Sequence, residues 1–235
     1  MTFLILGRRE RGKTTLAYYM ARKVRKRVII DARRLIRRVD VEIVHSPRAL
    51  RLAMADLAID ETLNEIVYQP DSEDLDAAFE DWTRVVRAFT IAHPDLPLAI
   101  MIDEASFYEL HKPGFQWLCK CTPRDRVHIL VTAHRPTDIP TSVRAIADHW
   151  CIFATRQEHD LRAIEERTGS ARVSVAITRL RDRDYVHWDD SHGVSRVCDR
   201  PADWYTALHS VDRPTPETVR VIDPVEDQDF ELDGE

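Results

Sequence analysis

Short apolar runs alternate along the chain with segments whose apolar residues recur at helical spacing. Five runs predict buried strands: residues 2–6, 28–30, 98–102, 127–131 and 150–153. Between them, helical spacing is clearest after Lys13 and along residues 72–90. Because alternating strands and helices favour a parallel sheet with helices on both faces, the pattern predicts an α/β fold.

Weaker patterns predict the remaining elements. Residues 32–64 are expected to be mostly helical, and Asp71 is expected to cap the helix over 72–90, which Pro94 and Pro97 end. We also expect short strands at 65–68 and 185–188, a helix that stops at Gly169, and a helix over 170–180.

The carboxyl-terminal part of the chain has a different composition. From Pro201 onward prolines interrupt the pattern, and residues 226–235 are acidic with little to bury. With 235 residues and 44% hydrophobic composition, the chain suits one domain, expected over 1–198, plus a proline-containing acidic tail over 199–235. No apolar run approaches the roughly 20 residues that span a bilayer, so we expect a soluble, cytoplasmic protein without a transmembrane segment.

Charge is distributed unevenly. Residues 8–51 hold fifteen Lys and Arg against four Asp and Glu, whereas residues 201–235 hold two against ten. A basic region on a protein of net charge −6 indicates either a polyanion partner or an ordinary solvated face.

Residues 7–14 read GRRERGKT, which matches the phosphate-binding loop pattern GxxxxGK[ST] between a strand and a helix. In such a loop, backbone N–H groups surround phosphates at a helix N-terminus, where the helix dipole favours negative charge. Lys13 is expected to reach the β- and γ-phosphates of ATP, and the Thr14 hydroxyl to ligate Mg²⁺. The predicted nucleotide-binding residues are Gly7, Arg8, Arg9, Glu10, Arg11, Gly12, Lys13, Thr14 and Thr15.

Residues 98–104 read LAIMIDE and place two acids at the carboxyl end of a buried strand. Ligands of α/β sheets bind beside that end of the strands. Asp103 is therefore expected to serve Mg²⁺, as in a Walker B strand, and Glu104 to polarise the attacking water. The alternative is that the two acids only mark the point where a buried strand reaches the solvent, without a role in catalysis.

A third polar position follows the strand at 127–131, where Thr132 or His134 is placed to sense the γ-phosphate. The chain has no NKxD motif, so it is not expected to be a Ras-like GTPase. The Asp-Glu pair favours an ATPase with a catalytic glutamate. A nucleotide or small-molecule kinase, and an ATP-binding phage assembly protein that does not pump DNA, remain alternatives.

Residues 132–153, TAHRPTDIPTSVRAIADHWCIF, and residues 158–169, EHDLRAIEERTG, resemble the region after Walker B in the HerA/FtsK superfamily of DNA-pumping ATPases. With GRRERGKTT and LAIMIDEA, the resemblance covers roughly residues 2–190. The compact size is most similar to viral genome-packaging ATPases of that superfamily, and zonula-occludens-toxin-like phage proteins are similar too. The chain departs from the family in having His134 where Gln is usual, and in lacking an extra glycine inside the phosphate loop.

The resemblance implies a P-loop NTPase of the RecA-like, ASCE type, with a mostly parallel sheet between helices. It implies an ATP- and Mg²⁺-dependent translocase of double-stranded DNA that acts as a homo-oligomeric ring, with a hexamer favoured. An arginine from one subunit would complete the neighbouring site, and the candidates are Arg135 and Arg144, with Arg156 behind them. The basic residues between 22 and 38 would line the DNA path. Viral capsid or portal proteins are possible partners, and the location would be host cytoplasm or virion.

Overall fold

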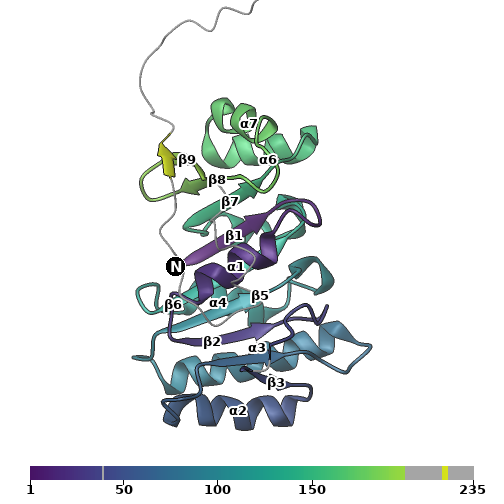
Figure 1. The fold of residues 1–235 in the computed structure, drawn as a ribbon, viewed down its shortest axis with the longest axis vertical. Coiled ribbons are helices and arrows are strands. Elements are labelled where there is room, and N and C mark those ends of the chain that lie inside the picture. Colours follow the sequence, from purple (N-terminus) through teal and green to yellow (C-terminus); the bar gives the residue numbers. More distant parts are fainter. Residues whose placement is uncertain (39, 199–218, 222–235) are drawn as a thin grey trace, which may run out of the picture.

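All the described strands belong to one sheet. The structure, a computed structural model, describes residues 1–38, 40–198 and 219–221. Within these residues the sheet has ten strands in the order β10-β9-β8-β7-β1-β6-β5-β2-β4-β3 (Figure 1). Strands from β7 to β3 in this order are parallel, and β8, β9 and β10 add to the β7 side as antiparallel strands.

The strands are β1 Thr2–Leu6, β2 Lys26–Ile30, β3 Glu42–Val44, β4 Glu65–Tyr68, β5 Leu98–Ile102, β6 Val127–Ala133, β7 His149–Phe153, β8 Tyr185–Asp189, β9 Val194–Cys198 and β10 Val219–Val221. The α-helices are α1 Lys13–Ala21, α2 Pro47–Ile59, α3 Leu75–Ala92, α4 Pro113–Cys121, α5 Thr141–Arg144, α6 Glu158–Thr168 and α7 Ala171–Thr178. Two short 3₁₀ helices are η1 Ala105–Phe107 and η2 Pro136–Asp138.

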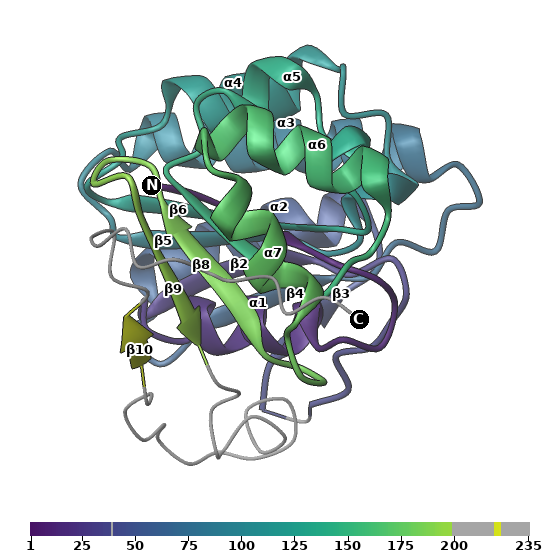
Figure 2. The same cartoon turned by 90° about the horizontal axis from the view of Figure 1, so that it is seen from above.

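Helices cover both faces of the sheet. Helix α1 packs on one face, where Leu16, Ala17 and Tyr18 join a core cluster with alternate residues of the strands. Helices α2, α3 and α4 pack on the other face, where Trp82 and Phe115 are completely buried. Figure 2 shows α1 on one side of the sheet and α3, α4 and α6 on the opposite side. The predicted α/β sandwich with a mostly parallel sheet is therefore confirmed.

The central strands follow the apolar runs, but the predicted helical content of residues 32–64 was too high. Residues 32–38, 40 and 41 are irregular, residues 42–44 form strand β3, and only α2 is helical, with Ser46 as its N-cap. Strand β2 ends at the carboxyl edge of the sheet, and β3, which runs parallel to β4, begins at the amino edge. The segment between them therefore has to cross from one edge of the sheet to the other. The predicted helix exists within this stretch as α2, but the loop before it was not predicted.

Three other elements differ from the predicted ones. The cap of α3 is Asp74, whose carboxylate accepts a hydrogen bond from the Ala77 N–H, and Asp71 lies outside the helix. Helix α4 was not predicted, and neither was strand β9, which forms a hairpin with β8. The predicted tail, residues 199–235, lies outside the described residues except for β10, which pairs with β9. None of the described helices is long and apolar enough to cross a bilayer.

Candidate active site

Strand register brings the predicted site residues to one edge of the sheet. Ile30 lies opposite Ile102, and Leu6 lies opposite Ala133, so the residues that follow β1, β2 and β5 meet at the carboxyl ends of the parallel strands. This edge is where open α/β sheets bind ligands. The same edge receives the N-terminus of α1.

The backbone of the phosphate-binding loop depends on its two glycines. Gly7 has a φ of 154°, and a Cβ built there would lie 2.7 Å from the Cβ of Phe153 on the neighbouring strand β7. Gly12 is the N-cap of α1 with a φ of 97°, in the left-handed region that side chains disfavour. These backbone conformations direct the chain from the loop into the nine-residue helix α1. The first N–H groups of this helix have no partner within it.

Lys13 is buried at the start of α1, with 4% of its surface exposed. Its Nζ donates to the Arg8 carbonyl at 3.0 Å and lies 3.5 Å from Nδ1 of His134. Burial lowers the pKa of Lys13, although the nearby carboxylates of Glu104 and Asp103 oppose the shift. The ammonium group keeps donors for a ligand, because an ammonium group has three.

The loop's other charged side chains behave differently from one another. Arg8, Arg9 and Glu10 are exposed. Arg11 forms an ion pair with Asp182, in the segment between α7 and β8. Arg8 and Arg9 are thus exposed to solvent, whereas the ion pair of Arg11 with Asp182 connects the loop to the segment between α7 and β8.

Asp103 connects the loop to strand β5. Its Oδ1 accepts hydrogen bonds from Thr14 Oγ1 at 2.8 Å and from Thr132 Oγ1 at 2.9 Å. Its other oxygen, Oδ2, is buried without a hydrogen-bond partner among the described residues. Burial raises the pKa of Asp103 to about 7, and the charge of Asp31 adds to the shift, while the two hydroxyls oppose it.

These oxygens fit Mg²⁺. Mg²⁺ prefers oxygen ligands and usually takes one or two from protein, with substrate phosphates and water filling the remainder. Thr14 Oγ1 and the unpartnered Oδ2 of Asp103 are such oxygens beside a phosphate-binding helix end. Among the described residues, no three His, Cys, Asp or Glu side chains gather into a metal-binding cluster. A metal ion at this edge would therefore need ligands from phosphate or water as well.

Glu104 is held from several directions. Its backbone has a φ of 52°, unusual for a residue with a side chain, and its N–H donates to Thr132 Oγ1 at 2.7 Å. Arg33 Nη1 donates to Oε1 at 2.9 Å. His134 Nε2 lies 2.8 Å from Oε2 without the geometry of a hydrogen bond, so Oε2 has no hydrogen-bond partner among the described residues.

The structure brings both candidate sensor residues to the site, in different positions. Thr132 is fully buried and fixes both Asp103 and Glu104. His134 lies between Lys13 and Glu104, and its side chain is 24% exposed. Sequence reasoning did not single out Asp31, which follows the apolar run of β2 just as Asp103 follows that of β5.

The candidate arginines for a neighbouring subunit lie apart. Arg135 is exposed directly after His134, and its N–H donates to Asp138. Arg144 lies only five residues before β7, so it is toward the opposite edge of the sheet, and its Nη2 donates to Thr141 Oγ1. Arg156 is exposed three residues after β7. Of the three, Arg135 is nearest along the chain to the residues of the site.

The predicted DNA path over residues 22–38 is not one continuous surface. Strand β2 divides it, with Lys26 at the amino edge and Arg33 beyond the carboxyl edge. Several of its basic side chains bind other protein groups: Lys26 donates to two carbonyls, Arg27 pairs with Glu65, and Arg38 pairs with Asp40. The sequence count of charges could not show these internal contacts.

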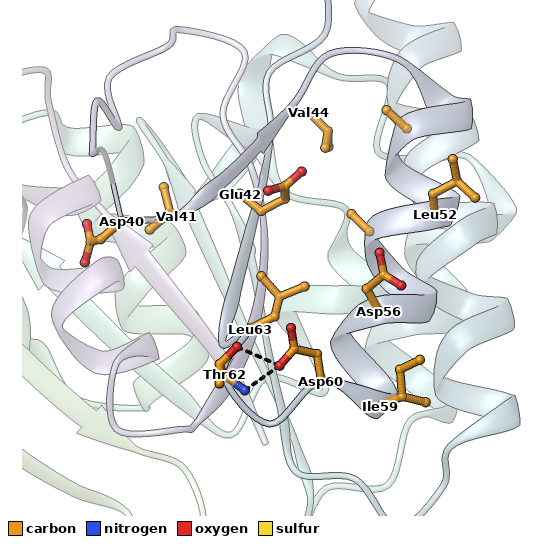
Figure 3. Close-up of a pocket in the computed structure, with 12 residues that line it drawn as sticks. Asp40, Val41, Glu42, Val44, Leu52, Asp56, Ile59, Asp60, Thr62 and Leu63 are labelled. Carbon is orange, nitrogen blue, oxygen red and sulfur yellow. Dashed lines mark hydrogen bonds between the residues drawn. The ribbon is translucent and has the colours of Figure 1, made fainter.

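A separate hollow of about 700 Å³ lies between β3 and α2 (Figure 3). It combines exposed apolar side chains, Leu52 and Ile59, with the carboxylates of Asp56 and Asp60. Strands β2 and β4 lie between β3 and β5, so this hollow is not part of the candidate active site.

Comparison with known proteins supports the fold without giving a sequence family. No protein-family model matches the chain, and no curated protein matches it in sequence. A solved structure of the genome packaging NTPase B204 from Sulfolobus turreted icosahedral virus 2 matches with a TM-score of 0.65 and 17% identity, over 83% of this chain and 94% of that one. The chain therefore has the same fold as B204.

VirB4 shares this fold. VirB4 of Thermoanaerobacter pseudethanolicus matches with a TM-score of 0.58 and 12% identity, over 81% of this chain and 87% of that one. B204 itself has been solved in complex with AMPPCP and with ATP-gammaS. The predicted resemblance to packaging ATPases is thus confirmed in the fold.

Proposed function

We propose that this chain is a Mg²⁺-dependent ATPase that moves double-stranded DNA as one subunit of a homo-oligomeric ring, in viral genome packaging. The observation that carries the proposal is the 2.8 Å contact of Thr14 Oγ1 with Asp103 Oδ1, which joins the phosphate-binding loop to the strand that ends in Glu104. The fold shared with B204, which was solved with ATP analogues, supports the choice of ATP and of packaging.

Each residue at the edge has a role in this reaction. The N–H groups at the start of α1 and the ammonium group of Lys13 bind the phosphates. Thr14 and Asp103 would hold Mg²⁺, which when bound would supply charge neutralisation for the phosphates. Glu104 accepts a hydrogen bond from the attacking water and orients it in line with the γ-phosphate. His134, between Lys13 and Glu104, senses whether a γ-phosphate is present.

Duplex DNA tests the translocase part of the proposal. Phosphate contacts by exposed arginines are independent of sequence and weaken steeply with salt. We therefore expect duplex DNA of any sequence to raise ATP turnover at low salt, and the effect to fade as salt rises. Turnover that duplex DNA leaves unchanged at low salt contradicts DNA translocation.

Particle shape tests the ring. Negative-stain images of the protein with ATP and DNA are expected to show closed rings, with six subunits favoured. In such a ring Arg135, exposed beside His134, is our first candidate for the arginine that reaches the neighbouring site. A monomer that transfers phosphate to a nucleoside contradicts the motor and supports the kinase alternative.

A further inference from the structure

The acidic carboxyl-terminal segment has no part in the proposed reaction. Residues 222–235 read IDPVEDQDFELDGE, with seven Asp and Glu and no Lys or Arg, and they lie outside the described residues. Phe230 and Leu232 are two positions apart. In an extended chain such residues point to the same side, so the segment can present two large apolar side chains flanked by carboxylates. A matching surface is apolar inside and cationic at its rim.

One hollow of this kind opens on the face of the sheet that α1 covers. It has a volume of about 360 Å³, within the range of pockets that bind small ligands, and we call it the α1 hollow. Phe3 and Met20 contribute to its apolar wall, and Lys23, two residues after the end of α1, lines it and is exposed to solvent. The imidazoles of His128 and His187 also line it, and no Asp or Glu is among its described lining residues. The α1 hollow therefore combines an apolar wall with a lysine and has no carboxylate of its own.

Strand β10 directs the segment toward the α1 hollow. Strands β8, β9 and β10 alternate in direction, and β8 is antiparallel to β7, so β10 ends toward the amino edge of the sheet. Its last residue, Val221, lies opposite Arg196, and Arg196 lies opposite His187. Because neighbouring strands are about 4.8 Å apart, Val221 is about 10 Å from a residue that lines the hollow. Arg196 is exposed between them and offers a second cation.

The length of the segment also selects this hollow. Phe230 is nine residues from Val221, so it lies at most about 30 Å from it. His128, which lines the α1 hollow from β6, is five strand spacings or about 24 Å from β10. The hollow between β3 and α2 is nine strand spacings or about 43 Å away, and carboxylates line it. The α1 hollow is thus within reach of Phe230, whereas the hollow between β3 and α2 is not.

A third hollow has the matching charge but lies too far away. It has a volume of about 460 Å³ between α2 and α3, and Arg51 and Arg84 are among its lining residues. Those helices pack against β4 and β2, seven or more strand spacings from β10, or at least about 34 Å, on the face opposite α1. Phe230 does not extend that far. Reach and charge together favour the α1 hollow.

We propose that residues 222–235 dock in the α1 hollow of their own chain, with Phe230 and Leu232 inside it. Docking removes these two apolar side chains from water, and the carboxylates around them come close to Lys23 and Arg196. The hollow adjoins the carboxyl-terminal end of α1, away from the phosphate-binding loop. The docked segment stabilises the position of the helix whose first residues belong to the candidate active site.

Disulfide cross-linking in the full chain tests the docking. Met20→Cys places a thiol in the wall of the α1 hollow, and Gln228→Cys places one two residues before Phe230, on the same side of an extended segment. We expect this double variant to form an intramolecular disulfide under mild oxidation, identified by mass spectrometry of its peptides. The wild-type protein and the two single variants correct for the native cysteines, of which Cys121 is exposed.

A matched pair of cysteines controls for reach alone. Val175 is on α7, which packs against β8 on the face of the sheet opposite α1, and it is 48% exposed. Val175→Cys with Gln228→Cys therefore places an accessible thiol near the same strands but outside the α1 hollow. Because docking raises the effective concentration of the segment's thiol at the hollow, we expect the Met20 pair to cross-link at least about tenfold faster than the Val175 pair.

Further changes in the segment and in the hollow identify what holds the two together. Phe230→Ser with Leu232→Ser should slow the cross-linking in the hollow to the rate of the matched pair, because the apolar contact is lost. Lys23→Gln should slow it several-fold, and high salt should do the same. Arg162→Gln, which removes an exposed, paired arginine of α6, should leave the rate unchanged. Thermal melts show whether each variant is folded.

Three outcomes would overturn the docking. Equal rates for the two cysteine pairs mean that the segment visits both faces of the sheet without docking. A disulfide between chains instead of within one chain places the segment on a second copy. A rate that does not change when Phe230 and Leu232 are replaced shows proximity without an apolar contact. The assay contains neither ATP nor DNA, so its result is independent of the ATPase and translocase proposal.

Discussion

The two edges of the sheet each bury a lysine and a glutamate, and they use them differently. At the amino edge, Lys26 donates to the carbonyls of Asp60 and Leu63, and both oxygens of Glu65 accept hydrogen bonds. At the carboxyl edge, Lys13 donates to one carbonyl and Glu104 keeps an oxygen without a hydrogen-bond partner among the described residues.

This difference distinguishes buried polar groups that only stabilise the fold from those that are available to bind a ligand. A buried polar group without a partner costs roughly 1 to 3 kcal/mol, so a ligand that supplies the missing partner binds more favourably at such a group. The partners of Lys26 and Glu65 are all within the domain, and these residues therefore stabilise the fold. Oδ2 of Asp103 and Oε2 of Glu104, unpartnered among the described residues, both lie at the carboxyl edge, where Mg²⁺ would satisfy the first and the attacking water the second.

The largest effect is expected from removing the site lysine. Lys13→Ala removes the charge that binds the β- and γ-phosphates, and we expect ATP turnover to fall by about a hundredfold or more. The measurement is steady-state phosphate release at saturating Mg²⁺ and ATP.

Lys26→Ala is the matched variant at the other edge. It should lower the melting temperature, because two carbonyls lose their donor, yet turnover per folded molecule should stay near the wild-type value. Equal losses of turnover in the two variants would remove the distinction between the edges.

A second effect concerns the backbone of the loop. Gly7→Ala places a methyl group 2.7 Å from Phe153 Cβ and strains a φ of 154°, so we expect a loss of about 2 to 3 kcal/mol in the free energy of unfolding. Gly169→Ala, at a φ of 65° with open space around it, should cost only about 1 kcal/mol. Urea denaturation measures both, and an equal cost would show that the contact with β7 does not matter.

The smallest effect concerns pH at the antiparallel side of the sheet. Burial lowers the pKa of His187 to about 4, with His149 and Arg196 adding to the shift and Asp189 opposing it. The unfolded chain therefore takes up this proton first, and stability present above about pH 6.5 is lost as the pH falls toward 4. We expect a loss on the order of 1 to 2 kcal/mol, reduced in His187→Gln. Urea denaturation at pH 7 and pH 4.5 measures it, and the same loss in both proteins contradicts this role.

Local sequence predicted the elements that carry the phosphate chemistry. The run GRRERGKT has its strand and helix within twenty residues, and LAIMIDE contains its strand and both acids. The parallel sheet places β1 and β5 on either side of β6, so their carboxyl ends lie at the edge where Thr14 contacts Asp103. For these residues, the sequence motifs and the sheet topology were sufficient to predict where they lie.

Contacts made by irregular segments were not predictable in the same way. The pairing of Arg33 with Glu104 depends on the path of residues 32–38, whose sequence has no periodicity, and sequence reasoning assigned Arg33 to a DNA surface instead. Arg38 was assigned there too, yet its guanidinium lies against Asp40 and Tyr18. Helix α4 escaped prediction because it is short and begins with Pro113 and Gly114, which look like a turn.

The most direct test of the account is hydrolysis by Glu104→Gln compared with Glu65→Gln, each measured in a single turnover after ATP binding has been verified with a fluorescent nucleotide. Glu104→Gln should bind ATP with near wild-type affinity and hydrolyse it about a hundredfold more slowly or worse. Glu65→Gln, which alters the satisfied glutamate of the amino edge, should hydrolyse ATP at the wild-type rate while folded. A near wild-type rate in Glu104→Gln would contradict the assignment of this edge as the catalytic site.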